Sequence, residues 1–167
     1  MRPGFFVLKQ FILQKPFIDM KIVKALIGGF AGAIALNLLH ETVRRFDRKA
    51  PRVDLIGEEA LSKGLEAVGI DPPKGDKLYA ATLAGDILSN GLYYSAIGIG
   101  APKFLWVRAA VVGLSAGIGA LELPEPMGLD DTPVTYSEKT EVLTVTWYLF
   151  GALVTAAVLS GLKNKNI

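Results

Sequence analysis

The sequence predicts an all-α integral membrane protein, a four-helix bundle with an extramembrane amphipathic helix between helices one and two. The composition is strongly apolar, with 51% hydrophobic and 20% charged residues. Four segments are long and apolar enough to cross a bilayer. One polar stretch between the first two has the periodicity of an amphipathic helix. A length of 167 residues allows one domain, so residues 1–167 are expected to form a single membrane domain.

A transmembrane helix needs about 20 predominantly apolar residues. The predicted spans are residues 22–39, 78–100, 104–123 and 140–162. Lys24 lies near enough to the end of the first span to reach the interface, whereas Asp86 and Asn90 interrupt the second. The fourth span carries no charge between Glu141 and Lys163. Such long apolar runs favour helices over strands.

The connections between the spans carry breaking and capping signals. The turn at residues 101–103 contains a proline and predicts an antiparallel hairpin of the second and third spans. Asp76 is expected to cap the second span, and Thr135 with Glu138 resembles a capping box before the fourth. Three prolines between Leu123 and Val134 predict an ordered loop without a regular element.

The polar region at residues 41–77 contains the predicted amphipathic helix, over Asp54–Ile70. We expect Asp54 to be its N-cap and Gly69 to end it, and Pro72 and Pro73 prevent its continuation. Its apolar face either rests on the bundle or lies on the membrane surface, and periodicity alone does not separate these two placements.

Residues 1–19 are interpreted either as an interfacial segment or as the result of a start assigned too early, with Met20 as the true initiator. A signal peptide cleaved after residues 33–35 is a further alternative, but the apolar run continues without a break through Leu39. Lys and Arg number nine on each side of the predicted membrane, or six against nine if translation begins at Met20. The orientation therefore stays open.

The composition also excludes several classes of function. The 18 basic and 16 acidic residues nearly balance, which argues against a nucleic-acid partner. The absence of cysteine excludes a disulfide scaffold, a thiolate metal site and a cysteine nucleophile.

Asp86 is the first candidate for chemistry, because a carboxyl group within a span needs a partner or a purpose. Asn90 follows one helical turn later, and Tyr93 and Tyr94 extend the polar stripe. Asp86 is interpreted as a proton or cation site, or as a structural group paired with Arg108 or a nearby hydroxyl. Arg108 is the less suitable partner, since it would lie roughly 15 Å away along the axis. We therefore expect Asp86 and Asn90 to point towards the first or third span.

A second polar cluster closes the first span, and its members recur at helical spacing. They are Asn37, His40, Glu41, Arg44 and Arg45. Glu122 or Glu125 could complete a carboxylate-rich site around His40, but one histidine beside one glutamate is weak evidence for a metal. An interfacial salt-bridge cluster is the favoured interpretation, and neither a metal nor a cofactor is expected.

No catalytic motif is present: the sequence lacks Gly-x-Ser-x-Gly, paired histidines and a phosphate loop. A triad could be drawn from Ser89, His40 and Asp86, yet nothing in their spacing supports it. We expect no enzymatic activity.

Small residues four apart predict helices that approach closely. The pairs are Gly28 and Gly32, Ala81 and Gly85, and Gly113 and Gly117. Whether these faces meet within one chain or between copies is open. The expected function is that of a structural or accessory membrane subunit, with the lipid bilayer and either a second copy or another membrane protein as partners. The alternative is a small oligomeric transporter or channel using Asp86 and Asn90.

Two further motifs suggest a family. Pro126-Met127-Gly128-Leu129, followed by Pro133 and by Trp147-Tyr148-x-x-Gly151, resembles the end of small YagU-like proteins of the bacterial inner membrane. The run Gly28-Gly29-x-Ala31-Gly32-Ala33 is similar to the opening of their first span. The resemblance implies a multi-pass protein of the bacterial inner membrane, and it supplies no catalytic residue because that family has no assigned activity.

Overall fold

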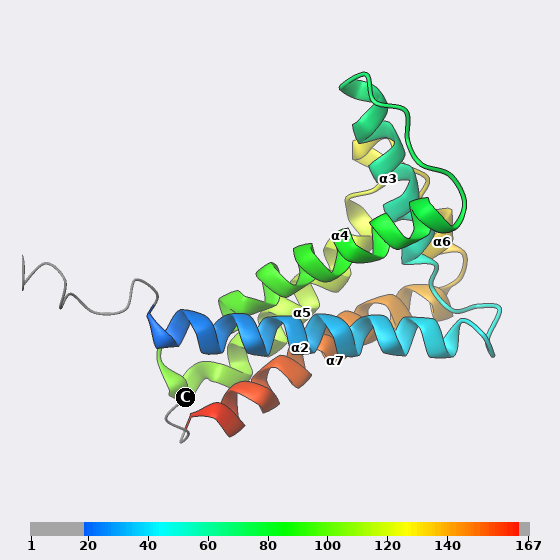
Figure 1. The fold of residues 1–167 in the computed structure, drawn as a ribbon. Coiled ribbons are helices and arrows are strands. Elements are labelled where there is room, and N and C mark those ends of the chain that lie inside the picture. Colours follow the sequence, from blue (N-terminus) through cyan, green and yellow to red (C-terminus); the bar gives the residue numbers. More distant parts are fainter. Residues whose placement is uncertain (1–18, 164–167) are drawn as a thin grey trace, which may run out of the picture.

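The computed structural model describes residues 19–163, which form helices and connecting segments without a strand (Figure 1). The long helices are α2 (Met20–Val43), α4 (Asp76–Ser95), α5 (Leu105–Glu122) and α7 (Glu138–Leu162). The shorter elements are α3 (Val53–Ala67), α6 (Thr132–Thr135) and the 3₁₀ turns η1 (Ala96–Gly98), η2 (Pro102–Phe104) and η3 (Glu125–Met127).

Three helical segments are long and apolar enough to cross a membrane: α2, α5 with the turn before it, and α7. The helix in the predicted second span, α4, is not among them, although it is 20 residues long. Asp76, Lys77 and Asp86 lower its hydropathy, as do its serine and asparagine side chains. It also ends at Ser95, and a 3₁₀ turn replaces the last part of the predicted span.

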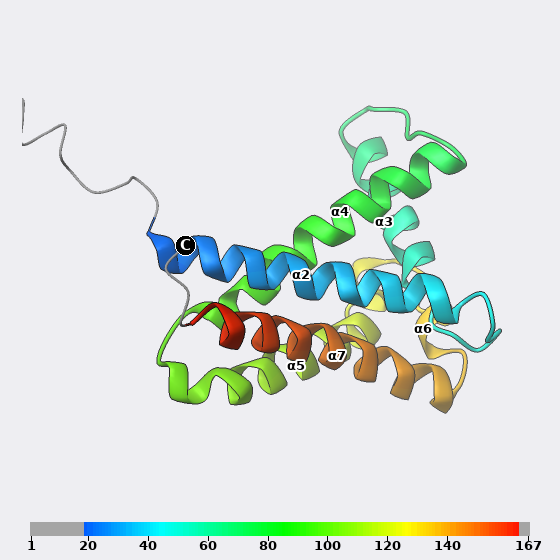
Figure 2. The ribbon, with the colours of Figure 1, turned by 60° about the horizontal axis from the view of Figure 1, so that its bottom comes forward.

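The helix α2 lies between α4 and α7, and α7 in turn packs on α5 (Figure 2). The predicted hairpin of α4 and α5 is therefore wrong as a packed pair, although the two helices follow one another through the turn at 101–103. The hydroxyls of Tyr93 and Ser115, 2.9 Å apart, form one of the few links between them. Instead, α4 packs on α2 and α5 packs on α7, because glycines allow close approach at these two contacts.

Two of the three small-residue pairs pack within the chain. A Cβ atom at Gly32 would collide with Thr155 and with the carbonyl of Gly151 in α7. A Cβ atom at Gly117 of α5 would lie 2.6 Å from the Cα atom of Val145, which is also in α7. The prediction of a tight bundle is confirmed for these faces, whereas Gly85 has open space beside it.

The bundle has two distinct ends. At the end called here the terminal end, Lys24 Nζ donates a 3.0 Å hydrogen bond to the carbonyl of Leu162, which joins the start of α2 to the end of α7. The connection from α4 to α5 lies at the same end (Figure 1). The opposite end, the loop end, carries residues 44–75 and 123–137.

The amphipathic helix is confirmed: it is α3, which packs against α4 and α6. Asp54 is not its N-cap, as predicted, because the helix begins one residue earlier with Arg52 as cap, and the Asp54 carboxylate binds arginines instead. Gly69 does end it, with a φ of 76° that favours glycine. The helix has no fully buried residue, so it covers the bundle without entering its core.

Three local predictions in the connections are wrong. Ser137 caps α7 by accepting from the Thr140 N–H, while Thr135 ends α6. Gly75, not Asp76, precedes the first residue of α4. The proline-rich segment contains the short helical elements η3 and α6, because proline is well suited to the first turn of a helix.

The predicted interfacial segment at residues 1–19 lies outside the described residues, apart from Asp19. The Asp19 carboxylate accepts a 2.9 Å hydrogen bond from the Lys21 N–H and caps α2. From Met20 to Val43 this helix is continuous.

Candidate functional site

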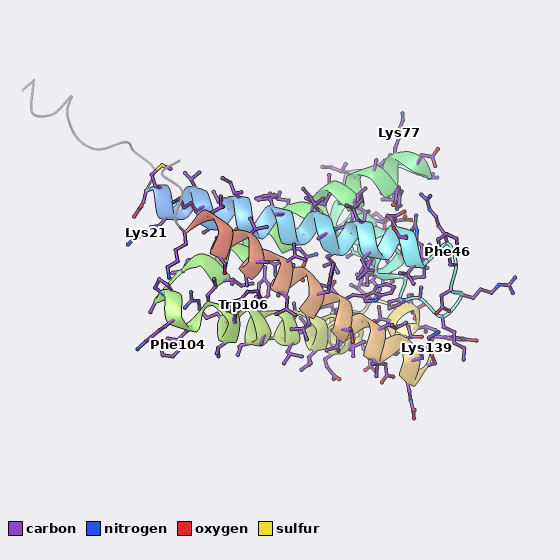
Figure 3. All side chains as sticks on the ribbon, turned by 90° about the horizontal axis from the view of Figure 1, so that it is seen from below. Lys21, Phe46, Lys77, Phe104, Trp106 and Lys139 are labelled. Carbon is purple, nitrogen blue, oxygen red and sulfur yellow. The ribbon has the colours of Figure 1, made fainter. Side chains whose placement is uncertain are left out.

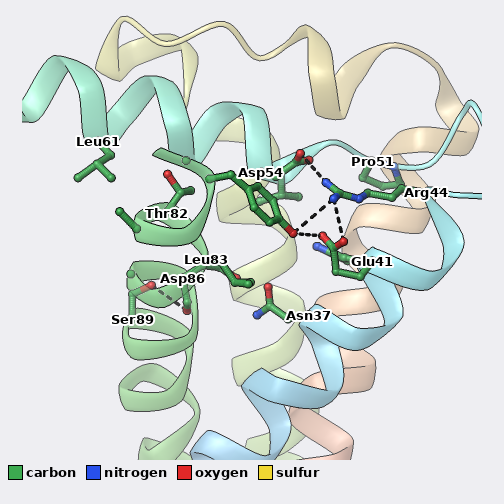
Figure 4. A pocket seen from close by; sticks show the side chains of 16 residues that line it. Asn37, Glu41, Arg44, Pro51, Asp54, Leu61, Thr82, Leu83, Asp86 and Ser89 are labelled. Atoms are coloured by element: carbon green, nitrogen blue, oxygen red, sulfur yellow. Dashed lines mark hydrogen bonds and ion pairs between the residues drawn. The ribbon is translucent and has the colours of Figure 1, made fainter. Parts of the chain in front are cut away.

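A pocket of about 240 Å³ lies between α2, α3 and α4 at the loop end. It forms because α2 and α4 meet closely where Gly29 approaches Gly91 and Ser95, and then diverge towards the loop end (Figure 1). Four of the five predicted site residues line it: Asn37, His40, Glu41 and Asp86. The fifth, Asn90, donates to Asp86. The two predicted polar clusters thus form one site (Figure 4).

Arg44 organises the mouth of the pocket (Figure 4). Its guanidinium forms ion pairs of 2.8 Å with both Glu41 and Asp54, which joins α2 to α3. It also lies over the Tyr79 ring, 5.2 Å from the centroid. The Tyr79 hydroxyl donates to Glu41 at 2.5 Å and accepts from Arg44 at 3.3 Å. One arginine therefore connects all three helices, as the interpretation of an interfacial salt-bridge cluster requires.

Asp54 holds the α3 side of this network. Arg52 binds it through Nε at 2.9 Å and through Nη2 at 2.7 Å, in addition to the bond from Arg44. Burial raises the pKa of the Asp54 carboxyl, but the hydrogen bonds and charges of the two arginines outweigh it and hold this pKa below its usual value. Asp54 is therefore an anion at neutral pH.

Asp86 forms the deep end of the pocket. Its Oδ1 atom accepts a 2.8 Å hydrogen bond from Asn90 Nδ2. The Asn37 side chain of α2, whose Nδ2 donates to the Ala33 carbonyl, lies opposite the carboxyl group in the same pocket (Figure 4). Arg108 instead donates to the carbonyls of Ile97 and Ala101 at the terminal end. The prediction that Asp86 points towards the first or third span, without pairing with Arg108, is confirmed, and the structure places it opposite the first.

Two residues that line this pocket, His40 and Thr82, each have a buried side-chain atom, Nε2 and Oγ1, without a hydrogen-bond partner within residues 19–163. The His40 ring packs against Trp147 with 4.7 Å between centroids and lies edge-on to Tyr148 at 6.3 Å. A buried polar atom without a partner costs about 1–3 kcal/mol, so a ligand that reached either atom would recover part of this cost.

The geometry supports neither a metal centre nor a catalytic triad. Within residues 19–163, no group of three or more His, Asp or Glu side chains could hold a metal ion, and neither Glu122 nor Glu125 lines the pocket. Ser89, His40 and Asp86 all line it, but the Ser89 hydroxyl donates to the backbone carbonyl of Asp86, and His40 Nε2 has no partner. The chain of hydrogen bonds that a triad needs is therefore not formed in this part of the protein.

Sequence reasoning missed Tyr79, Thr82 and the role of Asp54. Tyr79 and Thr82 continue the stripe of Asp86 towards the start of α4 at spacings of three and four residues. Extending that stripe backwards along the helix would have found both. No comparable signal links Asp54 to Arg44, since they lie on different helices.

Comparison with protein-family models, curated proteins and solved structures finds no match for this chain.

Proposed function

We propose that the chain is an integral membrane protein whose four long helices all cross the bilayer. The course of the chain supports this arrangement. The helix α2 ends at the loop end, yet α5 begins at the terminal end. If α2 crosses the membrane, α4 has to carry the chain back across it before α5 can begin. The polar groups of α4 are tolerated because Asn90 donates a hydrogen bond to Asp86 within the helix and Asp86 lies opposite Asn37 of α2 in the pocket.

The exposed surface also supports this placement. Large apolar side chains are exposed on every long helix, including Leu38 of α2, Leu92 of α4, Val111 of α5 and Val142 of α7. Phe104 and Trp106 are exposed and lie towards the terminal end, as Lys21 does (Figure 3). Aromatic and lysine side chains at the end of an apolar surface are typical of a membrane interface.

Within this bundle, the proposed function is to bind a small ligand that carries a hydrogen-bond donor or a positive charge, with Asp86 as its main partner. The observation that carries the proposal is the presence of the Asp86 carboxyl group in a pocket whose lining residues His40 and Thr82 each have a buried polar atom without a partner within residues 19–163. A carboxylate has about four acceptor positions, so the hydrogen bond from Asn90 leaves capacity for a ligand. The pocket is closed towards the terminal end, where Gly91 packs against Phe30.

This proposed function is closer to the predicted transporter or channel than to the predicted accessory subunit. The accessory role depended on small-residue faces free for a partner, but the Gly28, Gly32, Gly113 and Gly117 positions contact helices of the same chain. A bacterial inner-membrane location, a second copy and membership of the YagU-like family stay predictions from the sequence.

The first experiment tests the four-span arrangement. Because the chain has no cysteine, single cysteines introduced at Lys21, Lys74, Lys103 and Lys163 can be labelled without background. In intact vesicles, a membrane-impermeant maleimide should reach positions 21, 103 and 163 from one side and position 74 from the other. Labelling of positions 21 and 163 from opposite sides would contradict the arrangement.

The second experiment tests binding at Asp86. Thermal unfolding of the protein in mild detergent is measured with sodium, potassium or methylammonium chloride, and native mass spectrometry reports any ligand retained on purification. One of these cations, or a retained ligand, should stabilise wild-type protein but not Asp86→Asn. Asp76→Asn is the matched control, because it removes an exposed carboxylate from the same helix. A wild-type protein without retained ligand and without a shift for any cation would contradict the proposal.

A further inference from the structure

A second pocket of about 240 Å³ opens at the loop end, away from the Asp86 site. One wall is the connection from α2 to α3 with the start of α3, and the other is the segment that leads into α7. Basic side chains predominate among its charged lining groups, which are Arg48, Lys49, Arg52 and Asp130.

The two walls are held together by hydrogen bonds that do not involve the basic side chains facing the pocket. The Arg52 N–H donates to the carbonyl of Pro133 at 3.0 Å, and the Thr140 hydroxyl donates to the carbonyl of Lys49 at 3.2 Å. Lys139 adds an ion pair of 2.6 Å with Asp47 beside them. The two walls of the pocket are therefore joined by contacts of the chain itself.

The charges in this pocket are only partly neutralised. Arg52 pairs with Asp54 through Nε and Nη2. Within residues 19–163, the Arg48 and Lys49 side chains form no ion pair, and both residues are exposed. Two exposed cations outside ion pairs and a partly engaged guanidinium around one cavity are suited to a phosphate group, which accepts several hydrogen bonds.

Two exposed aromatic side chains accompany these charges. Phe46, in the turn before Arg48, is 85% exposed, and Tyr136, which lines the pocket, is 69% exposed. Figure 3 shows Phe46 at the loop end beside Lys139, opposite Lys21. The 24 residues of α2 extend over about 36 Å, slightly more than the ~30 Å of hydrocarbon. The turn after α2 thus reaches the level of the lipid headgroups.

We propose that this second pocket binds the phosphate of an anionic membrane lipid, with Arg48 and Lys49 as its main partners and Phe46 inserted among the lipids beside it. The proposal rests on the membrane placement proposed above, but it is independent of any ligand at Asp86. Proteins recognise anionic bilayer surfaces through exposed cationic side chains, which attract the lipid phosphates, and through exposed aromatic rings at the interface.

The test compares phosphatidylglycerol with phosphatidylcholine retained by the purified protein, measured by native mass spectrometry after reconstitution in equal mixtures of the two lipids. Wild-type protein should retain phosphatidylglycerol preferentially. The double variant Arg48→Gln/Lys49→Gln should lose roughly tenfold or more of that preference. The control variant Arg45→Gln removes one positive charge from the same connection. Because Arg45 lies outside the pocket lining, this variant should retain most of the preference.

Inorganic phosphate separates a lipid site from a site for free phosphate. If lipid is the ligand, phosphate displaces phosphatidylglycerol only weakly, and Phe46→Ala reduces lipid retention. Full displacement by inorganic phosphate, with no effect of Phe46→Ala, would overturn the lipid assignment. Equal retention by wild-type protein and the double variant, or an equal loss in Arg45→Gln, would overturn the site.

Extraction of vesicles with alkaline carbonate distinguishes the two proposals. Release of the protein would contradict the membrane-spanning arrangement itself. Protein that stays in the membrane but shows no lipid preference would contradict the lipid site alone.

Discussion

The two halves of the space between α2 and α4 differ in packing, although the same two helices form both. Near the terminal end, Gly29 meets Gly91 so closely that a Cβ atom on Gly29 would collide with the Gly91 carbonyl and with Ser95. Towards the loop end, Asn37 faces Asp86 across a pocket that α3 covers. Glycine allows the backbones to touch, whereas polar side chains that need partners keep them apart.

The comparison shows that close backbone packing and the pocket lie at opposite ends of one helix pair. The close end holds the angle between the helices, and that angle opens the other end. Variants can alter one end or the other.

The largest effect is expected from Gly29→Ala at the close end. The added methyl group meets backbone atoms of Gly91 and Ser95, which cannot move without displacing α4. We expect a loss of about 1–3 kcal/mol in the free energy of unfolding, measured by denaturation in mild detergent. Gly85→Ala is the matched control in the pocket half, where nothing lies within 4 Å. It should be neutral or slightly stabilising, because alanine favours helix. Equal losses in both variants would contradict the difference between the halves.

Removal of the Arg44 side-chain charge should have the next largest effect. In Arg44→Gln, Glu41 and Asp54 lose their shared partner, and α2 loses its tie to α3. Because these groups are partly exposed, we expect about 1–2 kcal/mol of destabilisation, measured by the same denaturation. Proteolysis within α3 should also become faster. Arg45→Gln serves as the control, since Arg45 is exposed and outside the network. Unchanged proteolysis of α3 would show that the network does not hold the cover of the pocket.

Acid should weaken the same end of the molecule. The pKa of Asp54 lies below its usual value of 3.8 in the folded protein, so its ionised form stabilises the fold at neutral pH. That stabilisation is complete above the unfolded-state pKa and is lost as the pH falls from 3.8 through the folded-state pKa. Asp54→Asn should flatten this part of the curve of melting temperature against pH. Asp71→Asn, at an exposed position after α3, should leave the curve unchanged. A curve for Asp54→Asn identical to that of wild type would contradict the role of Asp54.

The smallest effect is expected from Lys139→Gln. This change breaks the ion pair with Asp47, in which the lysine is exposed and water screens the charges. The hydrogen bond from Lys139 lowers the pKa of Asp47, but the contribution of this pair to stability should be small. Any difference in melting temperature from wild type should disappear in high salt. A large loss that persists in salt would show that this pair holds the loop end together.

The sequence by itself determined where the long helices lie and that they are apolar. The predicted spans at 104–123 and 140–162 agree with α5 and α7 to within a few residues, because long apolar runs bounded by Gly, Pro and charged residues leave little choice of start or end. The caps were less predictable, since Thr135 and Ser137 are both good N-cap residues and only the direction of the incoming chain selects Ser137.

The tertiary structure decided which helix faces meet. Each polar cluster was visible in the sequence, because spacing of three and four residues places side chains on one face of one helix. Their union in a single pocket depends on the rotation and crossing of α2 and α4, which follow from the contact of Gly29 with Gly91 and not from either polar stripe. Asp54 joins the site for the same kind of reason: local periodicity describes one helix at a time, and only packing brings α3 over the end of α2.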